Sequence, residues 1–514
     1  MSPHRHPLIT GTLVVAFLLT GVLTQAPPLG HLWIAQAQQA TTSTPTGARP
    51  QVRSEIPALR TRTSRTYALS NGQQQVEISS GPVNYQAGGG WQPIDNTLDA
   101  ETGGVVNRAN AYHVHFPHDL GQAPIRVETA AGWVEFRPEA AKGAPALSGQ
   151  TATYSSPGVR WQYTAGNSQV KENIILADAS SPSSFTYALH TGPGISARQD
   201  ASGGIALLDA AGTTVGSFAA PYMYDSSDTP AGVSHALRLT LSQSGPTQTM
   251  TLVADPHWLQ DPARRYPVTI DPSLTLGSIT EQGAQDCKLV GGAYASTNFC
   301  RQSNLTVGYD GTYPNRVPLQ FNIAALQSYV PANSVVQSAD LGLYLYGSST
   351  GTVTTVSAYA LTQAWTQSAT WNTYDGTNAW STPGGQFSSQ PVATSTVSPT
   401  PGWVHWYPSA QLVQGWVDGS VANTGLILKE PSENVVNLLQ FYSAEYATSS
   451  YWPSLTITYV PPAGGRGSST FIDQGIHDGL SVAVNVASGN LLAQATDFSM
   501  AGIGRWSCPG SVES

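Results

Sequence analysis

The chain has 514 residues, enough for several domains of about 150 residues each, and a formal net charge of −9. Because nucleic-acid affinity depends on clustered Lys and Arg, this acidic balance argues against a nucleic-acid partner. Charged residues make up only 10% of the chain, whereas Gly and Pro number 50 and 36. That composition favours all-β structure with many turns and disfavours long surface helices.

The first 37 residues have the pattern of an export signal. Leu13 to Leu23 form an apolar run after a weakly positive start, and Ala35-Gln-Ala37 offers a small-residue cleavage site. The run is short for a membrane-spanning helix. We therefore expect residues 1–37 to be a signal peptide, the mature chain to be secreted or extracellular, and no membrane span to remain after cleavage. A retained N-terminal anchor is the alternative.

Residues 38–66 are rich in Thr, Ser, Pro and Arg without apolar periodicity, so we interpret them as a linker. Beyond Tyr67, short alternating runs separated by turn signals predict the strands of a sandwich or of stacked hairpins. They are Gln75 to Ser79, Tyr112 to Phe116, Ile125 to Glu128, Trp133 to Phe136, Val159 to Tyr163, Val170 to Leu176, Phe185 to Leu189 and Ala236 to Leu241. Residues 67–272 are thus predicted to form an N-terminal β domain, which ends where Pro267 and Pro272 bracket one short strand.

The hydrophobic centre of a second domain is Val335 to Trp371. Its leucines at 341, 343 and 345 fall at period two, and Gly342, Tyr344 and Tyr346 take the opposite face. A turn of Gly, Ser and Thr follows, and Val353 to Leu361 alternates again. Two alternating runs joined by a short turn predict an antiparallel hairpin. One helix is predicted, from Ser409 to Val417, and alternation at 455–459 predicts a closing strand.

Four segments of this second region carry a family resemblance. In order they are NLTVGYDGTYPNRVPLQFNIAAL, the stretch from Val335 to Trp371, SAQLVQGWVDGSVANTGLILK and YWPSLTITYV. Together they resemble the DNRLRE domain, a secreted bacterial β-sandwich. The resemblance implies that residues 273–460 form a DNRLRE-like β-sandwich, so the whole chain is expected to be all-β with two sandwich-like domains. It also implies carbohydrate binding, and a position upstream of RHS/YD-repeat arrays in wall-associated proteins.

Residues 461–514 are interpreted as a linker and the truncated start of an RHS-type region. GLSVAVNVASGNLLAQATDFSMAGIG resembles the junction where such arrays begin, but RWSCPGSVES departs from the family pattern. The hypothesis is that a frameshift truncated a longer protein, and a genuine chain end is the alternative. Downstream DNA without YD-type repeats in any frame would refute the frameshift.

Two of the three cysteines, Cys287 and Cys300, enclose a short loop. Because the chain is expected to be exported, this spacing predicts a disulfide between them. Zinc is the weaker alternative, since two thiolates without nearby Cys or His partners do not complete a tetrahedral site.

Three motifs raise the question of catalysis or metal binding. The segment YHVHFPHDL could place His113 and His115 on one strand face as zinc ligands. Alternatively, the two histidines lie on the solvent-exposed face of an ordinary strand. The segment GSSTG matches a nucleophile motif, but it lies between two strands and is read as a turn. Glu430 and Glu433 are interpreted as solvated loop charges rather than a glycosidase pair. We therefore expect no catalytic residue, no metal and no cofactor.

Aromatic residues crowd the second domain, and flat sugar faces pack on aromatic rings. Tryptophans 365, 371 and 416 sit in family-like motifs and are assigned to the core. Trp380, Trp403, Trp406 and Tyr451 lie in Gly/Pro/Ser-rich segments and are the candidate carbohydrate-binding residues.

The sequence thus predicts a secreted, non-enzymatic, carbohydrate-binding region of an RHS-type wall-associated protein, whose partner is a polysaccharide or cell-wall glycan. One alternative is a structural scaffold or plug for an RHS repeat shell, without sugar binding. Another is a secreted glycan hydrolase or lyase. The residues identify neither the glycan nor bound calcium nor the oligomeric state.

Overall fold

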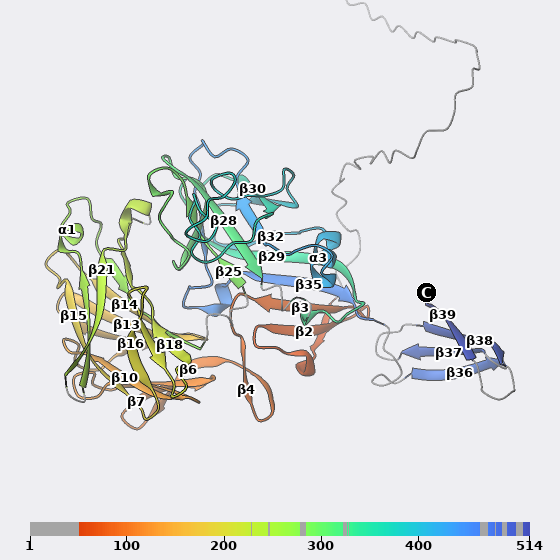
Figure 1. The fold of residues 1–514 in the computed structure, drawn as a ribbon, viewed down its shortest axis with the longest axis horizontal. Coiled ribbons are helices and arrows are strands. Elements are labelled where there is room, and N and C mark those ends of the chain that lie inside the picture. Colours follow the sequence, from red (N-terminus) through yellow and green to blue (C-terminus); the bar gives the residue numbers. More distant parts are fainter. Residues whose placement is uncertain are drawn as a thin grey trace, which may run out of the picture. The chain divides into compact units, whose positions relative to one another are not determined.

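The computed structural model describes residues 51–227, 229–244, 247–277, 284–321, 326, 328–462, 471–477, 480–485, 491–499 and 507–513. The strands pair antiparallel, and the helices are short (Figure 1). The all-β prediction is confirmed. The predicted signal peptide and the start of the predicted linker lie outside the described residues. In the part of the chain that the structure describes, no helix is long and apolar enough to cross a membrane.

The N-terminal sandwich consists of two sheets. One has the order β21–β22–β15–β10–β9–β8–β7–β6, and the other has the order β11–β12–β13–β14–β24–β18–β17–β16, with β23 beside β14 and β19, and β20 beside β19. The first sheet comprises β6 (Asp95–Glu101), β7 (Gly104–Ala109), β8 (Tyr112–Pro117), β9 (Ile125–Thr129), β10 (Gly132–Pro138), β15 (Ser184–Thr191), β21 (Leu237–Ser244) and β22 (Thr247–Ala254). The second comprises β11 (Ala146–Ser148), β12 (Thr151–Ser156), β13 (Val159–Ala165), β14 (Gln169–Leu176), β16 (Ser196–Gln199), β17 (Ile205–Leu208), β18 (Thr214–Phe218), β19 (Tyr222–Tyr224), β20 (Val233–Ser234), β23 (Val268–Asp271) and β24 (Leu274–Leu276).

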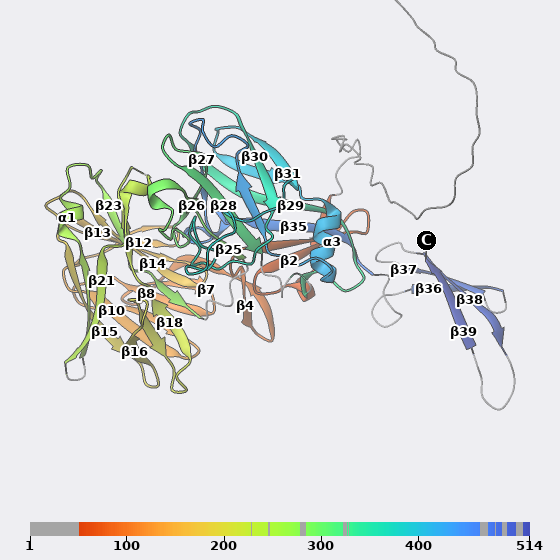
Figure 2. The ribbon, with the colours of Figure 1, turned by 45° about the horizontal axis from the view of Figure 1, so that its top comes forward.

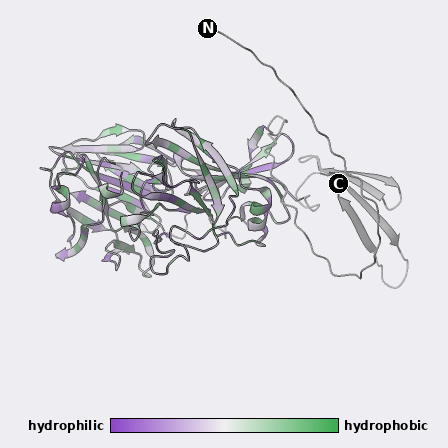
Figure 3. Ribbon diagram, turned by 90° about the horizontal axis from the view of Figure 1, so that it is seen from above, coloured by the Kyte–Doolittle hydropathy of each residue, from purple (hydrophilic) through white to green (hydrophobic). Residues whose placement is uncertain are grey.

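Alternating burial forms the core of this sandwich. In β8, Tyr112, Val114 and Phe116 are buried while His113 is exposed, as expected of a strand with one face on the core. Hydrophobic and hydrophilic residues are accordingly interspersed along the strands (Figure 3). The largest buried side chains of this core are aromatic: Phe116, Phe136, Tyr154, Trp161, Tyr163, Tyr187 and Phe218. The strands predicted between residues 112 and 241 are all present, with ends shifted by a few residues.

The C-terminal sandwich is one curled sheet with the order β1–β2–β3–β35–β29–β34–β27–β28–β33–β30–β31, to which β25 and β26 add at β28 and β32 adds at β29. Its strands are β1 (Val52–Glu55), β2 (Ser64–Leu69), β3 (Gln74–Ser79), β25 (Ala284–Asp286), β26 (Leu289–Val290), β27 (Asn304–Tyr309), β28 (Pro314–Phe321), β29 (Val335–Ser348), β30 (Thr354–Ala360), β31 (Ala393–Val397), β32 (Gly402–Trp406), β33 (Leu426–Lys429), β34 (Leu439–Tyr442) and β35 (Ser454–Val460). The long strand β29 pairs with β35, β32 and β34, and Figure 2 shows it beside β35. The helices and 3-10 turns of both sandwiches are η1 (Pro57–Leu59), η2 (Pro230–Gly232), α1 (Pro256–Leu259), η4 (Gly292–Tyr294), α3 (Ala410–Asp418) and η5 (Ser449–Tyr451).

The predicted hairpin between β29 and β30 is wrong. Both runs are strands, but β30 pairs with β31 and β33, and four strands of the curled sheet separate it from β29. Leu343 of β29 and Val356 of β30 therefore meet across the core instead of side by side. The short Gly-containing turn carries the chain from one layer to the other.

The start of the chain also differs from the predicted boundaries. Strand β1 and the first three residues of β2 fall within the residues interpreted as linker, and β3 pairs with β35, so the hairpin β2–β3 extends the C-terminal sandwich. Strand β2 buries Ser64 and Thr66, whose hydroxyl-bearing side chains give no apolar alternation. Strands β4 (Asn84–Ala87) and β5 (Gly90–Pro93) form a separate hairpin before the N-terminal sandwich begins.

Helix α3 is where the sequence predicts it. Ser409 caps its start, because its side chain accepts a hydrogen bond from the Leu412 amide, and Gly419 ends it in the left-handed conformation (φ 76°). Val413 and Trp416 lie buried in the core of the C-terminal sandwich.

Cys287 and Cys300 form a disulfide, as the sequence predicts. Both are buried in a satellite cluster with Trp365, Trp380 and Ile427. Four further strands in the predicted RHS-type region make a sheet of their own, in the order β36 (Phe471–His477), β37 (Leu480–Asn485), β38 (Leu491–Ser499) and β39 (Ser507–Glu513).

Candidate functional site

Two of the four predicted carbohydrate-binding residues are buried. Trp406 is 0% exposed and its indole Nε1 donates to the Val356 carbonyl at 2.9 Å, while Trp380 is 3% exposed and donates to the Thr370 carbonyl at 2.9 Å. Trp406 is buried because side chains alternate between the two faces of β32, so that residues 403 and 405 are exposed and residue 406 faces the core. Trp380 instead fills the cluster around the disulfide. Neither ring face is available to a sugar.

The other two predicted residues come together on the outer face of the C-terminal sandwich. Trp403 is 42% exposed and Tyr451 is half-buried. Tyr344 lies between them, with ring centroids 5.6 Å from Trp403 in an edge-on arrangement and 4.4 Å from Tyr451. Tyr344 and Trp403 are directly paired across β29 and β32, which is why their rings meet.

These rings are part of a longer series, here called the aromatic row. Alternation in β29 turns Tyr344 and Tyr346 outward, opposite the buried leucines, and Tyr442 of β34 stacks on Tyr346 with centroids 4.6 Å apart. Tyr446 stacks on Tyr442 at 3.7 Å, the tightest ring contact of the series. The full row comprises Tyr344, Tyr346, Trp403, His405, Tyr407, Tyr442, Tyr446 and Tyr451.

One end of the aromatic row continues into a cavity of about 280 Å³, here called the tyrosine cleft. Tyr346, Tyr442 and Tyr446 line one side, and Tyr222 and Tyr224 line the other. Polar groups lie among these rings, from Lys288, Gln302 and Asn304. The Lys288 ammonium donates to the Asn304 side-chain oxygen at 3.0 Å, which fixes a cation and an amide at the edge of the cleft.

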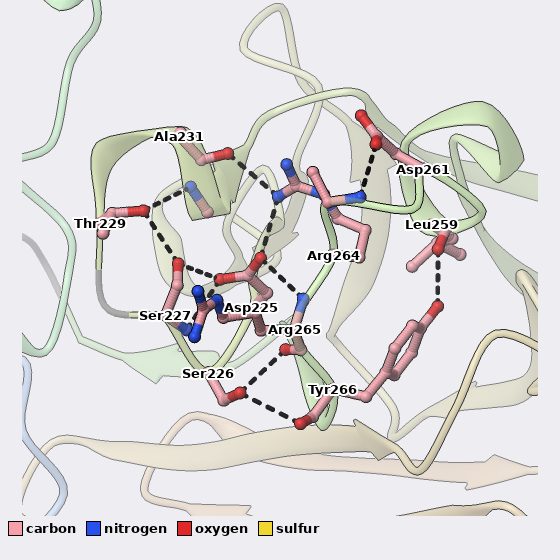
Figure 4. A network of polar contacts seen from close by, with 12 residues as sticks. Asp225, Ser226, Ser227, Thr229, Ala231, Leu259, Asp261, Arg264, Arg265 and Tyr266 are labelled. Carbon is pink, nitrogen blue, oxygen red and sulfur yellow. Dashed lines mark hydrogen bonds and ion pairs between the residues drawn. The ribbon is translucent and has the colours of Figure 1, made fainter.

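A buried carboxylate holds the loop that forms the opposite wall of the cleft (Figure 4). The two oxygens of Asp225 accept from the Arg264 guanidinium at 3.1 Å, the Arg265 amide at 3.2 Å and the Ser227 amide at 2.9 Å. Arg264 also donates to the Ala231 carbonyl and lies over the Trp258 ring, 4.3 Å from its centroid. Because charge-assisted bonds are strong when buried, this network holds residues 225–227 against residues 264–266.

The Tyr442 hydroxyl of the cleft is protonated near pH 7. Burial, together with the Tyr446 hydroxyl beside it, raises the pKa of Tyr442 to about 12. A neutral phenol both donates and accepts a hydrogen bond, which suits it to sugar hydroxyls.

The side chains considered for metal binding or catalysis form contacts with other residues of the chain. His113 and His115 share a strand face, and His115 Nδ1 lies 2.8 Å from the Glu101 carboxylate. No group of three or more His, Cys, Asp or Glu side chains that could hold a metal ion occurs among the described residues.

Glu430 is buried rather than solvated and accepts a hydrogen bond from the Thr354 hydroxyl, and burial raises its pKa to about 7. Glu433 forms a bidentate pair with Arg316 at 2.6 and 2.7 Å.

The sequence reasoning did not select Tyr344, Tyr346, Tyr442 and Tyr446 as site residues. The alternation of β29 already places the first two opposite the leucine face. The tyrosines of the first sandwich, at 222 and 224, carry no comparable signal, since they lie on β19, which is far away in sequence from β29 and β34.

In the comparison with known protein families, a family model matches part of the C-terminal sandwich. Residues 292–457 match the Disaggregatase related repeat domain, inside the region with the predicted DNRLRE resemblance. The tRNA3(Ser)-specific nuclease WapA of Bacillus spizizenii is 24% identical over 450 residues, which are 80% of this chain and 18% of that protein. The tRNA nuclease WapA of Bacillus subtilis strain 168 is 25% identical over 48% of this chain and 11% of its own length.

A shorter match reaches higher identity. The tRNA(Glu)-specific nuclease WapA of Bacillus subtilis subsp. natto is 31% identical over 29% of this chain and 6% of its own length. The chain therefore has a distant, partial similarity to WapA proteins and spans less than a fifth of the first relative. Among solved structures, the N-terminal domain of the Streptococcus gordonii adhesin Sgo0707 aligns with 90% of this chain at 7% identity, but its TM-score of 0.12 establishes no common fold.

Proposed function

We propose that this chain is a secreted, non-catalytic polysaccharide-binding region of a wall-associated protein, and that the aromatic row is its binding surface. The observation that carries the proposal is the position of the row. Five aromatic or imidazole rings of the row lie on the outer face of β29, β32 and β34 and the other three lie beside these strands, where none of the eight fills the core, and Trp403 and Tyr407 remain 42% and 52% exposed.

The chemistry of the row suits a sugar chain. Aromatic faces pack against the C–H groups of pyranose rings, and the phenol hydroxyls at their edges exchange hydrogen bonds with sugar hydroxyls. A series of rings repeated over several residues fits an extended polysaccharide better than a single compact ligand. The tyrosine cleft, at about 280 Å³, has room for a small terminal group of such a chain.

The setting outside the cytoplasm is supported by two further observations. The disulfide between Cys287 and Cys300 is consistent with an oxidising compartment. The similarity to WapA proteins agrees with the RHS-type context that the sequence resemblance implies.

Affinity electrophoresis through gels containing cell-wall polysaccharides tests the proposal. The wild-type chain is expected to be retarded, and Trp403→Ala and Tyr344→Ala are each expected to lose most of the retardation. Trp91→Ala is the matched control, because Trp91 is a half-buried tryptophan on the β4–β5 hairpin, outside the aromatic row. If all four proteins were retarded equally, the aromatic row would not be the binding surface.

The two alternative functions give different results in the same experiment. A scaffold or plug without a sugar site would show no retardation on any polysaccharide. A glycan hydrolase or lyase would release soluble fragments from the gel matrix, and the proposed non-catalytic role requires that none appear.

A further inference from the structure

We propose that Lys171 and Asp271 are joined by an intramolecular amide cross-link, formed when the Lys171 amine condenses with the Asp271 carboxyl group. The inference rests on a buried pair on the face of β14 opposite the core of the N-terminal sandwich and is independent of sugar binding.

The two side chains are held together in an unusually close, buried pair. Lys171 Nζ lies 2.5 Å from Asp271 Oδ2, and each side chain is only 6% exposed. Lys171 is on β14, between the points where this strand pairs with β23 and with β24. Asp271 ends β23, and Pro272 interrupts the ladder there, so the lysine faces the break between two neighbouring strands.

The second carboxylate oxygen is held by separate donors. The Ser273 amide donates to Asp271 Oδ1 at 3.1 Å, and the Ser273 hydroxyl donates to the same oxygen at 2.5 Å. This arrangement leaves Oδ2 for the lysine and aims two donors at the oxygen on which negative charge develops when an amine attacks the carboxyl carbon. Such donors stabilise a tetrahedral intermediate.

The condensation balances without any other reactant. The ammonium first transfers a proton to Oδ2, which gives a neutral amine and a carboxylic acid. The Nζ lone pair then forms a bond to Cγ, and Oδ1 carries the charge beside Ser273. A second proton passes from Nζ to Oδ2, the Cγ–Oδ2 bond breaks and one water molecule leaves, so that a neutral amide remains.

Burial favours this outcome in two ways. Two desolvated charges are replaced by one neutral amide, which relieves the desolvation penalty of a buried ion pair. Fixing amine and carboxyl in contact also makes the reaction effectively unimolecular. A cavity of about 470 Å³, lined by Lys171, Asp271 and Ser273, adjoins the pair and gives the released water a path.

Peptide mapping by mass spectrometry of the folded, exported chain tests the cross-link. Trypsin is expected to leave the bond after Lys171 uncut, and the peptide containing Lys171 is expected to appear joined to the peptide containing Asp271, lighter than their sum by one water. Recovery of the two peptides separately, with cleavage after Lys171 in normal yield, would overturn the proposal.

Two substitutions serve as controls. Lys171→Arg keeps a cation beside Asp271 but replaces the amine by a weakly nucleophilic guanidinium, so the intact mass is expected to rise by the substitution and by one water. Lys142→Arg changes an exposed lysine and is expected to retain the cross-link. A Lys171→Arg chain that shows only the mass of the substitution itself would also contradict the proposal.

Discussion

The central strands β14 and β29 use the same alternation in different ways. In β14 each face carries one buried charged residue. Lys171 pairs with Asp271 on one face, and Glu172 on the other accepts from the Tyr163 and Tyr187 hydroxyls at 2.7 Å each. In β29 one face buries leucines and the other presents tyrosines to the aromatic row. The N-terminal sandwich thus buries polar groups on both faces of β14, whereas the C-terminal sandwich carries its candidate binding surface on the outer face of β29.

This comparison predicts the largest stability effect at Lys171. Replacing Lys171 by Met leaves the Asp271 carboxylate buried without its cation, so the free energy of unfolding should fall by about 3–5 kcal/mol. Urea denaturation followed by tryptophan fluorescence measures the change. A loss below about 1 kcal/mol would mean that the pair contributes no more than a surface ion pair does.

A double variant then separates the ionic contribution from the covalent one. If the pair is only ionic, Lys171→Met with Asp271→Leu should recover most of the loss, because apolar replacements of buried pairs are often neutral. If the pair is cross-linked, the double variant still lacks a bond between residues 100 positions apart. Closing a loop of that length contributes about 4.7 kcal/mol in the chain-entropy model, so the double variant should remain destabilised.

The next largest effect is expected at the disulfide of the C-terminal sandwich. Replacing Cys287 and Cys300 together by Ala opens a loop of sequence separation 13, which should lower the free energy of unfolding by about 3 kcal/mol. Reducing the wild-type protein before denaturation should reproduce this loss. If reduction and substitution both leave the unfolding curve unchanged, the bridge does not stabilise the folded chain.

The buried carboxyl group of Glu172 predicts a pH dependence of comparable size. Burial raises its pKa to about 7 from an ordinary value of 4.5, so in this range the folded chain binds more protons than the unfolded chain. Stability is then fully present below about pH 4.5 and falls as the pH rises towards 7, by about 3 kcal/mol in total. Urea midpoints across this range measure the loss attributable to Glu172.

The matched variant is Glu172→Gln. Its amide oxygen can still accept from both tyrosine hydroxyls, but it has no proton to lose. The difference in unfolding free energy between this variant and the wild type should grow from pH 5 to pH 7. A constant difference would show that Glu172 does not titrate in this range. Comparing the two proteins cancels the other buried carboxyl groups.

Local pattern was sufficient for the parts of the fold that depend on neighbouring residues. Alternation located the strands of the N-terminal sandwich, and the helical spacing of Leu412, Val413 and Trp416 located α3. For the candidate site, two of the residues predicted from residue type, Trp403 and Tyr451, lie in the aromatic row, whereas alternation in β32 buries a third, Trp406. Which side chains of a strand share a face can be read from the sequence of that strand alone.

Which strands become neighbours could not be predicted in the same way. Strand β3 pairs with β35 across most of the chain, and a short turn joins β29 to a strand in the other layer. Lys171 and Asp271 meet only because their strands lie side by side. Period-two patterning assigns each side chain to a face but does not specify its partner strand, so the aromatic row and the buried pair both required the structure.

The smallest stability effect is expected at Trp403, where the effect on binding is the informative one. Truncating Trp403 to Ala removes a half-exposed ring and its edge-on contact with Tyr344, so the free energy of unfolding should fall by only about 1 kcal/mol. If the aromatic row binds polysaccharide, the dissociation constant should rise by about tenfold, since the loss of one stacked ring is worth about 1.4 kcal/mol. Calorimetric titration with soluble wall polysaccharide measures the second change and urea denaturation the first. A large stability loss with unchanged affinity would instead make Trp403 a structural residue, and the outer face of β29 would then serve packing as its inner face does.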